Sequence, residues 1–200
     1  MQNSRTPSIQ RAKTLTFCAM FVALVAVCAQ ITVAMPSGIS FTLQTFAIAL
    51  CGYLLGVKYG ALVALVYLLL GAVGLPIFSA FRGGFYVLFG VTGGYIWGFM
   101  PMAALCGLAA NAKRKILPYV WGIPALLVCY FCGTVQFVLL TGTDFKAALL
   151  LCVTPYIWKD ILSLAAAAML AGRLRGVLKH FGFPPQRVIV ERAKQVRYLR

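Results

Sequence analysis

Residues 41–75 read FTLQTFAIALCGYLLGVKYGALVALVYLLLGAVGL, an almost unbroken apolar run with one charge, Lys58, at its centre. A single helix of that length would extend about 50 Å, far beyond the roughly 30 Å hydrocarbon core of a bilayer, and would bury the lysine. Gly56 and Gly60 flank Lys58, a pattern typical of a tight turn. The stretch therefore predicts two short, tilted membrane helices joined by a hairpin.

The rest of the chain has the same apolar character. Of its 200 residues, 62% are hydrophobic and only 10% are charged, which is more apolar surface than a soluble domain of this size can bury. We therefore predict an all-α integral membrane protein with six transmembrane helices. The apolar windows place these helices over residues 14–34, 41–56, 60–75, 86–110, 119–141 and 147–172.

The basic residues predict the orientation of the chain. With six spans, 15 of the 18 Lys and Arg residues fall on the side that also holds both termini, and the positive-inside rule makes that side cytoplasmic. We expect residues 1–172 to form the substrate-binding membrane domain, with a short basic N-terminus, and residues 173–200 to form a basic cytoplasmic tail. The net charge of +15 fits contact with anionic lipid, so we expect membrane lipid and no nucleic acid as a partner.

Several classes of protein are disfavoured by what the sequence lacks. It has no G-x-x-x-x-G-K-[ST] motif, so any ATP must be hydrolysed by another chain. The C-x-x-C of Cys129 and Cys132 lacks a second pair or a nearby histidine, and we expect neither a metal site nor a disulfide framework. Intramembrane catalysis needs several converging ionisable groups. We therefore expect no enzyme activity and no cofactor.

Asp160 is one of only three acidic residues and lies inside the last predicted span. A carboxylate at such depth costs about 2.5–3.5 kcal/mol on insertion scales, so it usually faces a polar cavity and marks a functional site. A salt bridge, or a position near the membrane interface, is the alternative. Lys159 is about 100° away around the helix, so we expect the two side chains to diverge unless Pro155 disturbs the backbone.

Two further regions are predicted on the outer side. The long connection between the third and fourth helices, residues 74–95, is too apolar for a solvent loop, and we expect a folded lid with tight glycine turns. Its Arg82 faces either an anionic ligand or solvent. Thr42, Gln44 and Thr45 open the second span and supply polar groups for a pocket mouth, unless Ser40 or Thr42 caps the helix.

The sequence resembles the biotin-transporter family, the vitamin-capturing membrane subunits of energy-coupling-factor systems. The resemblance rests on SFTLQTFAIALCGYLLGVKYGALVALVYLLLGAVGLPIF (40–78), GVTGGYIWGF (90–99) and TPYIWKD (154–160). It implies the six-helix S-component fold, one biotin bound near the outer face and a bacterial plasma membrane. It also implies a transmembrane coupling protein and two ATPase subunits as partners.

The resemblance also implies ligand-binding residues. It puts a pocket carboxylate at Asp160, an aromatic wall at Tyr95 beside Gly93 and Gly94, and polar groups at the motif that begins with Thr42.

The family commonly has glycine before this Asp and lysine three residues after it. Here Lys159 precedes the Asp and Ser163 follows it. Lys159 either replaces the family lysine or points elsewhere, and we expect Arg82 to meet the carboxylate of biotin. For docking to the coupling protein, the family uses small residues on the first helix. Ala19 and Ala23 fit that pattern, although such pairs are common wherever membrane helices pack.

The leading hypothesis is therefore biotin uptake by a high-affinity binding subunit that works with an ATP-driven module. The same fold could instead capture a different small vitamin or a biotin precursor. A third hypothesis is a solitary facilitator that carries biotin without partners.

Overall fold

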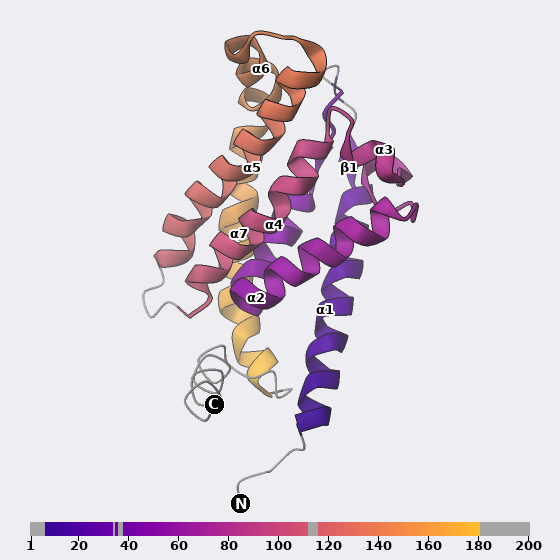
Figure 1. Ribbon diagram of the computed structural model, residues 1–200. Helices are drawn as coiled ribbons and strands as arrows, with labels where there is room; N and C mark the ends of the chain where they lie inside the picture. Colours follow the sequence, from indigo (N-terminus) through magenta and orange to yellow (C-terminus); the bar gives the residue numbers. More distant parts are fainter. Residues whose placement is uncertain (1–6, 34, 36–37, 112–115, 181–200) are drawn as a thin grey trace, which may run out of the picture.

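The computed structural model describes residues 7–33, 35, 38–111 and 116–180, and it is nearly all helical (Figure 1). The α-helices are α1 (Pro7–Gln30), α2 (Gln44–Ala72), α3 (Phe85–Leu88), α4 (Gly93–Leu108), α5 (Leu117–Thr141), α6 (Phe145–Cys152) and α7 (Thr154–His180). Two short 3-10 helices, Ser79–Phe81 and Ala109–Asn111, flank α3 and α4, and the strands are β1 (Thr32–Val33) and β2 (Phe41–Thr42). The two-residue antiparallel pair β1–β2 was not anticipated from the sequence.

The long helix α2 is broken at Gly56. Gly56 has φ 76° and ψ −176°, a combination that is essentially restricted to glycine. The two halves of α2 diverge from this point (Figure 1), and a Cβ on Gly60 would lie 2.9 Å from the Cα of Gly52 across the turn. Lys58 is exposed. The predicted hairpin of two short helices is therefore confirmed, although a single residue makes the turn.

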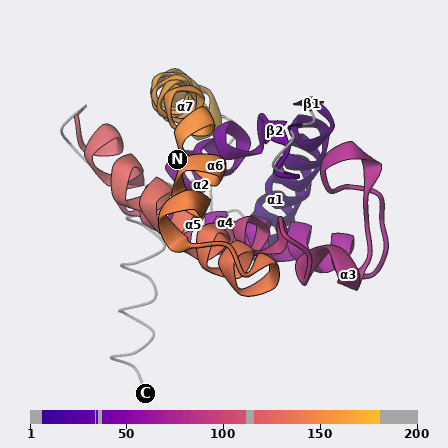
Figure 2. The same cartoon turned by 90° about the horizontal axis from the view of Figure 1, so that it is seen from above.

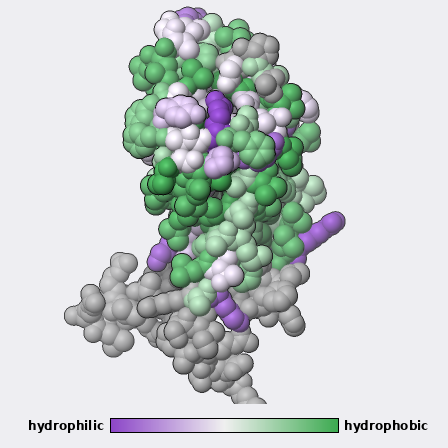
Figure 3. Space-filling model, turned by 90° about the vertical axis from the view of Figure 1, so that its right-hand side faces the viewer, coloured by the Kyte–Doolittle hydropathy of each residue, from purple (hydrophilic) through white to green (hydrophobic). Residues whose placement is uncertain are grey.

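The described helices account for a chain that crosses a membrane several times. By length and hydropathy, α1, α2 and α5 each qualify as spans, and α6 with α7, bent by 49°, qualifies as a fourth. The apolar helix α4 is shorter. With the halves of α2 counted separately, the described residues contain six apolar helical segments. The face drawn in Figure 3 is mostly hydrophobic, as expected for contact with lipid.

The predicted last span, 147–172, is two helices rather than one. Helix α6 ends at Cys152 and α7 starts at Thr154, with a bend of 49° between them. The hydropathy is continuous through Val153, so the sequence pattern did not reveal the bend. Likewise, the predicted window 86–110 contains the short α3 as well as α4.

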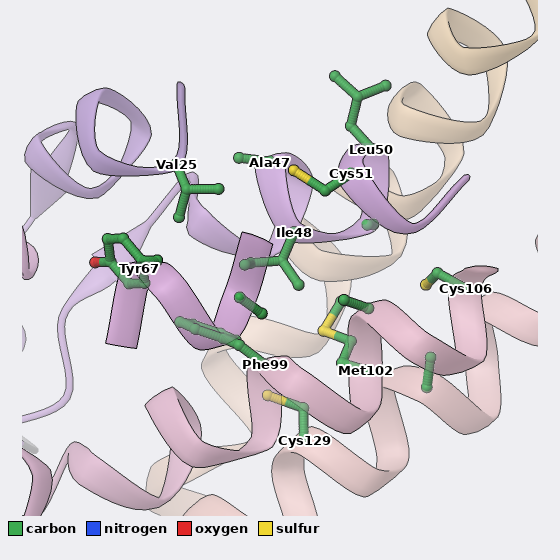
Figure 4. Close-up of a cluster of buried hydrophobic side chains, with 14 of the residues drawn as sticks. Val25, Ala47, Ile48, Leu50, Cys51, Tyr67, Phe99, Met102, Cys106 and Cys129 are labelled. Carbon is green, nitrogen blue, oxygen red and sulfur yellow. The ribbon is translucent and has the colours of Figure 1, made fainter. Parts of the chain in front are cut away.

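Helices α2 and α4 lie near the middle of the bundle, with α1, α5 and α7 around them (Figure 2). Glycines let these helices approach closely. A Cβ on Gly98 would lie 2.9 Å from the Cα of Cys129 on α5, and one on Gly107 would meet the backbone beside the break in α2. Between the helices, side chains such as Ile48 and Met102 form one buried apolar cluster (Figure 4).

The connection from α2 to α4 folds back onto the bundle. Phe78 is fully buried and its ring meets that of Tyr67 edge to face at 5.5 Å. The next turn holds Ala80 (φ 58°) and Phe81 (φ 54°) in the left-handed region, which costs about 1–2 kcal/mol per residue for amino acids other than glycine. The predicted lid is thus a packed segment with a strained turn.

Helix α7 continues beyond residue 172 to His180. Near its end, Arg175 donates to the carbonyl oxygens of Tyr53 (3.2 Å) and Ala109 (3.4 Å). Residues 181–200 of the predicted tail lie outside the described residues, so the division of the chain at residue 172 stays a prediction.

Candidate functional site

A cavity lies among α2, α4, α5 and α7, below the connection that leads to α4. Ile39, Ile96, Phe99 and Leu126 give it an apolar wall. Its polar lining is formed by Ser40, Thr42, Gln44, Thr45, Ser79, Thr92, Tyr95, Tyr130, Tyr156, Lys159 and Asp160. The entry to α2, the long connection and the start of α7 therefore meet at this cavity.

Asp160 lies in the second turn of α7 and is only 3% exposed. Its Oδ2 accepts a hydrogen bond of 2.6 Å from the hydroxyl of Tyr130 on α5. Its Oδ1 pairs with Nζ of Lys159 at 2.5 Å. One carboxylate oxygen is therefore held by Tyr130 and the other by Lys159. Because a carboxylate oxygen can accept more than one hydrogen bond, Oδ1 can also accept a donor from a ligand.

Lys159 also lies in the cavity, at 8% exposure. Its Nζ donates to the carbonyl of Thr42 at 2.8 Å and lies 4.9 Å from the ring centre of Phe41. The expectation that Lys159 and Asp160 point to different places is wrong. The flexible lysine stem spans the 100° step, and Pro155 sits in the first turn of α7, where it leaves the helix undisturbed.

Thr42 and Gln44 form the entry to α2 and are both buried. Thr42 Oγ1 donates to Gln44 Oε1 at 3.1 Å and also accepts a bond of 3.4 Å from the backbone N–H of Gln44. The N-cap residue of α2 is Leu43, which makes no side-chain capping bond. Thr42 therefore lines the cavity and satisfies the N–H of the first helical residue without being the N-cap. Gln44 Nε2 donates to the hydroxyl of Tyr67 at 2.7 Å, which fixes the orientation of the amide.

Tyr95 projects into the cavity from the first turn of α4, and its hydroxyl is 3.4 Å from the carbonyl of Cys152. Gly93 and Gly94 do not line the cavity. A Cβ at either position would collide with the backbone oxygen of Leu88 or of Cys132. These glycines let α4 begin tightly against α5, and so they position Tyr95.

Arg82 is half-buried and does not line the cavity. Its Nε and one terminal nitrogen donate to the carbonyl and the hydroxyl of Ser79, each at 3.2 Å. Ser79 does line the cavity. Arg82 therefore contacts a residue that lines the cavity but does not line the cavity itself. Its direct contact with a ligand stays a prediction.

Two tyrosines that line the cavity were not predicted from the sequence. Tyr156 donates to the carbonyl of Ile39 at 2.5 Å. It precedes Asp160 by four residues, so the helical period could have placed both on one face. Tyr130 is one of several hydroxyl-bearing residues in the apolar window 119–141, and nothing distinguished it from the others. The seven cysteines are all free, and Cys129 lines the cavity.

Ala19 and Ala23 are exposed on α1 and do not line this cavity. They line an apolar groove between α1 and the second half of α2, together with Leu62 and Val66.

Among the described residues, no three His, Cys, Asp or Glu side chains are grouped so that they could hold a metal ion.

The fold and the cavity together define a class, a multi-pass helical membrane protein with a polar ligand site buried between its helices. The family model described as the BioY family matches residues 1–180. The chain belongs to the BioY family.

Relatives and a solved structure agree with this assignment. A biotin transporter BioY of Thermotoga maritima is 42% identical over 159 residues, which cover 78% of this chain and 92% of that protein. The biotin transporter BioY2 of Lactococcus lactis is 32% identical over 183 residues, covering 90% and 96%. A crystal structure of the S-component for biotin from an ECF-type ABC transporter has a TM-score of 0.77 at 22% identity, covering 86% of this chain and 95% of that one. The predicted family and the six-helix S-component fold are therefore confirmed, as is the prediction of a transporter component rather than an enzyme.

Proposed function

We propose that this protein binds biotin with high affinity in the cavity beside Asp160 and delivers it across the membrane with an ATP-driven coupling module. The observation that carries the proposal is the Asp160 carboxylate, which is 3% exposed and lines the cavity. The names of the relatives, which are biotin transporters, support the choice of ligand.

The chemistry of the site suits a ligand with N–H donors. The ureido ring of biotin carries two N–H groups, and an ionised Asp160 would accept from them with charge-assisted hydrogen bonds. Tyr130, bonded at 2.6 Å to the other oxygen, would hold the carboxylate in a fixed orientation. Tyr95 would form an aromatic wall, with Gly93 and Gly94 as its support. Thr42 and Gln44 would form the polar edge.

The tail of biotin ends in a carboxylate and needs a cation or donors. Lys159 already pairs with Asp160 at 2.5 Å, and we assign it the role of balancing the charge of the binding carboxylate within the protein. Arg82 is held by Ser79 at the cavity wall, so a change of rotamer would let it meet the ligand carboxylate. Biotin is transported in this scheme, and no cofactor takes part.

The groove at Ala19 and Ala23 is the surface we propose for the transmembrane coupling protein. Both alanines are exposed on α1, and small side chains let a second helix approach closely within a membrane. Two ATPase subunits would complete the complex, because the chain itself has no phosphate-binding motif. The proposed setting is the bacterial plasma membrane with both termini cytoplasmic, residues 1–172 as the membrane domain and residues 173–200 as the tail.

Uptake of labelled biotin by biotin-auxotrophic cells tests the proposal. Cells that produce this chain with a coupling protein and two ATPases should accumulate biotin, and cells that produce an Asp160→Asn variant should not. The absence of uptake by the wild type in membranes that contain all four proteins would contradict the proposal. Uptake that persists without the ATPases would instead support a solitary facilitator.

A second ligand is favoured by one observation. Position 163 carries a buried serine where the resembling family commonly has lysine, and the lysine that lines the cavity here is Lys159, so the charges near the site are arranged differently. The same fold could therefore select another small vitamin or a biotin precursor. Competition between labelled biotin and such compounds for the purified protein would separate the two ligands.

A further inference from the structure

Gln30, the last residue of α1, is bonded to the connection that covers the cavity. Its Oε1 accepts a hydrogen bond of 2.9 Å from the backbone N–H of Phe81. Its Nε2 lies 3.3 Å from the carbonyl oxygens of both Ile77 and Phe78. The partners fix the orientation of the amide, because a backbone N–H must face the oxygen and carbonyls must face the nitrogen. One side chain of α1 thus holds both sides of the turn 77–82.

The turn that Gln30 holds is one that L-amino acids avoid. Ala80 and Phe81 are consecutive residues with positive φ, where the Cβ atom crowds the backbone. Both side chains are exposed, and Phe81 is 71% exposed, so side-chain burial does little to hold this conformation. Such strain persists only where the surroundings impose it, and it is common at ligand clamps. The hydrogen bond from the Phe81 N–H to Gln30 reaches the strained residues from outside the turn.

The same turn forms part of the cavity wall. Ser79 lines the cavity and directly precedes the two strained residues. The carbonyl of Ile77, which Gln30 approaches, also accepts a bond of 2.9 Å from Tyr67. The Tyr67 hydroxyl in turn accepts from Gln44 of the cavity at 2.7 Å. Hydrogen bonds therefore connect α1, the strained turn and the ligand site.

We propose that Gln30 is a positioning residue that keeps the strained turn 77–82 closed over the cavity and so slows the release of bound ligand. This inference rests on the proposed function for the identity of the ligand. Without the Gln30 amide, Phe81 loses its acceptor, and the left-handed residues can relax to ordinary backbone angles. Ser79 then leaves the cavity wall, and a bound molecule can escape.

The test is the dissociation rate of labelled biotin from the purified protein and its Gln30→Ala variant. We expect dissociation to become about tenfold faster, which corresponds to about 1.4 kcal/mol, while association does not slow. The matched control is Gln136→Ala. Gln136 on α5 donates to the carbonyls of Leu88 and Gly90, each at 2.8 Å, in the same connection, but it does not contact the strained turn. This control should change the rate by no more than about twofold.

A second substitution separates holding the turn from general stabilisation. Ala80→Gly, added to Gln30→Ala, should bring dissociation back to within about threefold of the wild-type rate, because glycine adopts positive φ without strain. Unchanged dissociation in Gln30→Ala, or faster dissociation that Ala80→Gly leaves uncorrected, would overturn the proposal.

Hydrogen exchange tests the turn without any ligand. The amide of Phe81 should exchange about tenfold faster in Gln30→Ala than in the wild type, since its acceptor is gone. Unchanged exchange at Phe81 would overturn the inference even if biotin binds. A wild type that shows no biotin binding would instead contradict the proposed function, and exchange would still decide whether Gln30 holds the turn.

Discussion

Around the cavity, polar side chains from different helices hold one another, whereas at the break in α2 the chain depends on positions that have no side chain. Asp160, Lys159 and Tyr130 lie within 2.5–2.6 Å of a partner in that group. At the break, Gly56 adopts angles reserved for glycine, and Gly60 and Gly107 leave room for neighbouring backbone. The structure of the cavity thus depends on polar side chains that pair with one another. The structure of the break depends on glycines, which have no side chain to obstruct the backbone.

The contrast predicts different consequences of substitution. A change at the cavity leaves a charge or a polar atom without its partner, so its effect depends on the companion residue. A substitution of a glycine at the break adds a Cβ that the backbone cannot accommodate. No second substitution is expected to restore the lost stability.

The largest effect is expected for Lys159→Met. Removing one member of a buried ion pair leaves the other charge uncompensated, which costs about 3–5 kcal/mol. The purified protein should therefore unfold at a clearly lower temperature in detergent. Adding Asp160→Asn should restore much of the stability, because no lone charge remains. If the double variant is as unstable as Lys159→Met alone, the two residues are not a coupled pair.

The next largest effect is expected for Gly56→Ala. Its backbone angles are strained for any residue with a Cβ, at a cost of about 3 kcal/mol, and thermal unfolding should report that loss. Gly142→Ala is the matched control, because Gly142 also has positive φ (67°) but ends α5 with no atom within 4 Å of an added Cβ. It should cost only about 1 kcal/mol. Equal losses at the two glycines would mean that the break is not specially constrained.

A smaller effect is expected for Tyr130→Phe. The variant keeps the ring but loses the hydroxyl that fixes Oδ2 of Asp160, so biotin binding should weaken about tenfold, or about 1.4 kcal/mol. Equilibrium binding measures this loss. Tyr119→Phe, at a partly exposed position on the same helix (39% exposed), should leave the affinity unchanged. Normal affinity in Tyr130→Phe would separate Tyr130 from the binding role of the carboxylate.

The same contrast explains how much the sequence could predict. The break near Lys58 was predictable, because the length of 41–75 and its central charge are incompatible with one membrane helix. The place of Asp160 in a polar cavity was predictable, because a carboxylate within an apolar span is costly. In both cases a charged residue lies in a stretch that would otherwise cross the bilayer. The energetic cost of that charge makes the position recognisable in the sequence.

What the sequence did not predict depends on contacts between distant residues. Tyr130 is 30 positions from Asp160, and Gln30 is 51 positions from Phe81, so no periodicity links either pair. The direction of Lys159 was predicted wrongly because the helical angle describes where the Cβ points and not where a long, flexible side chain ends. The bend between α6 and α7 leaves no mark in hydropathy.

Equilibrium binding of labelled biotin to the purified, detergent-solubilised protein tests the central claim most directly. The wild type is compared with Asp160→Asn and with the matched control Asp144→Asn, which alters an exposed carboxylate at the start of α6. We predict tight binding by the wild type and by Asp144→Asn, and at least tenfold weaker binding, about 1.4 kcal/mol, by Asp160→Asn. Absence of binding by a folded wild type, or equal affinity in Asp160→Asn, would contradict biotin capture at Asp160.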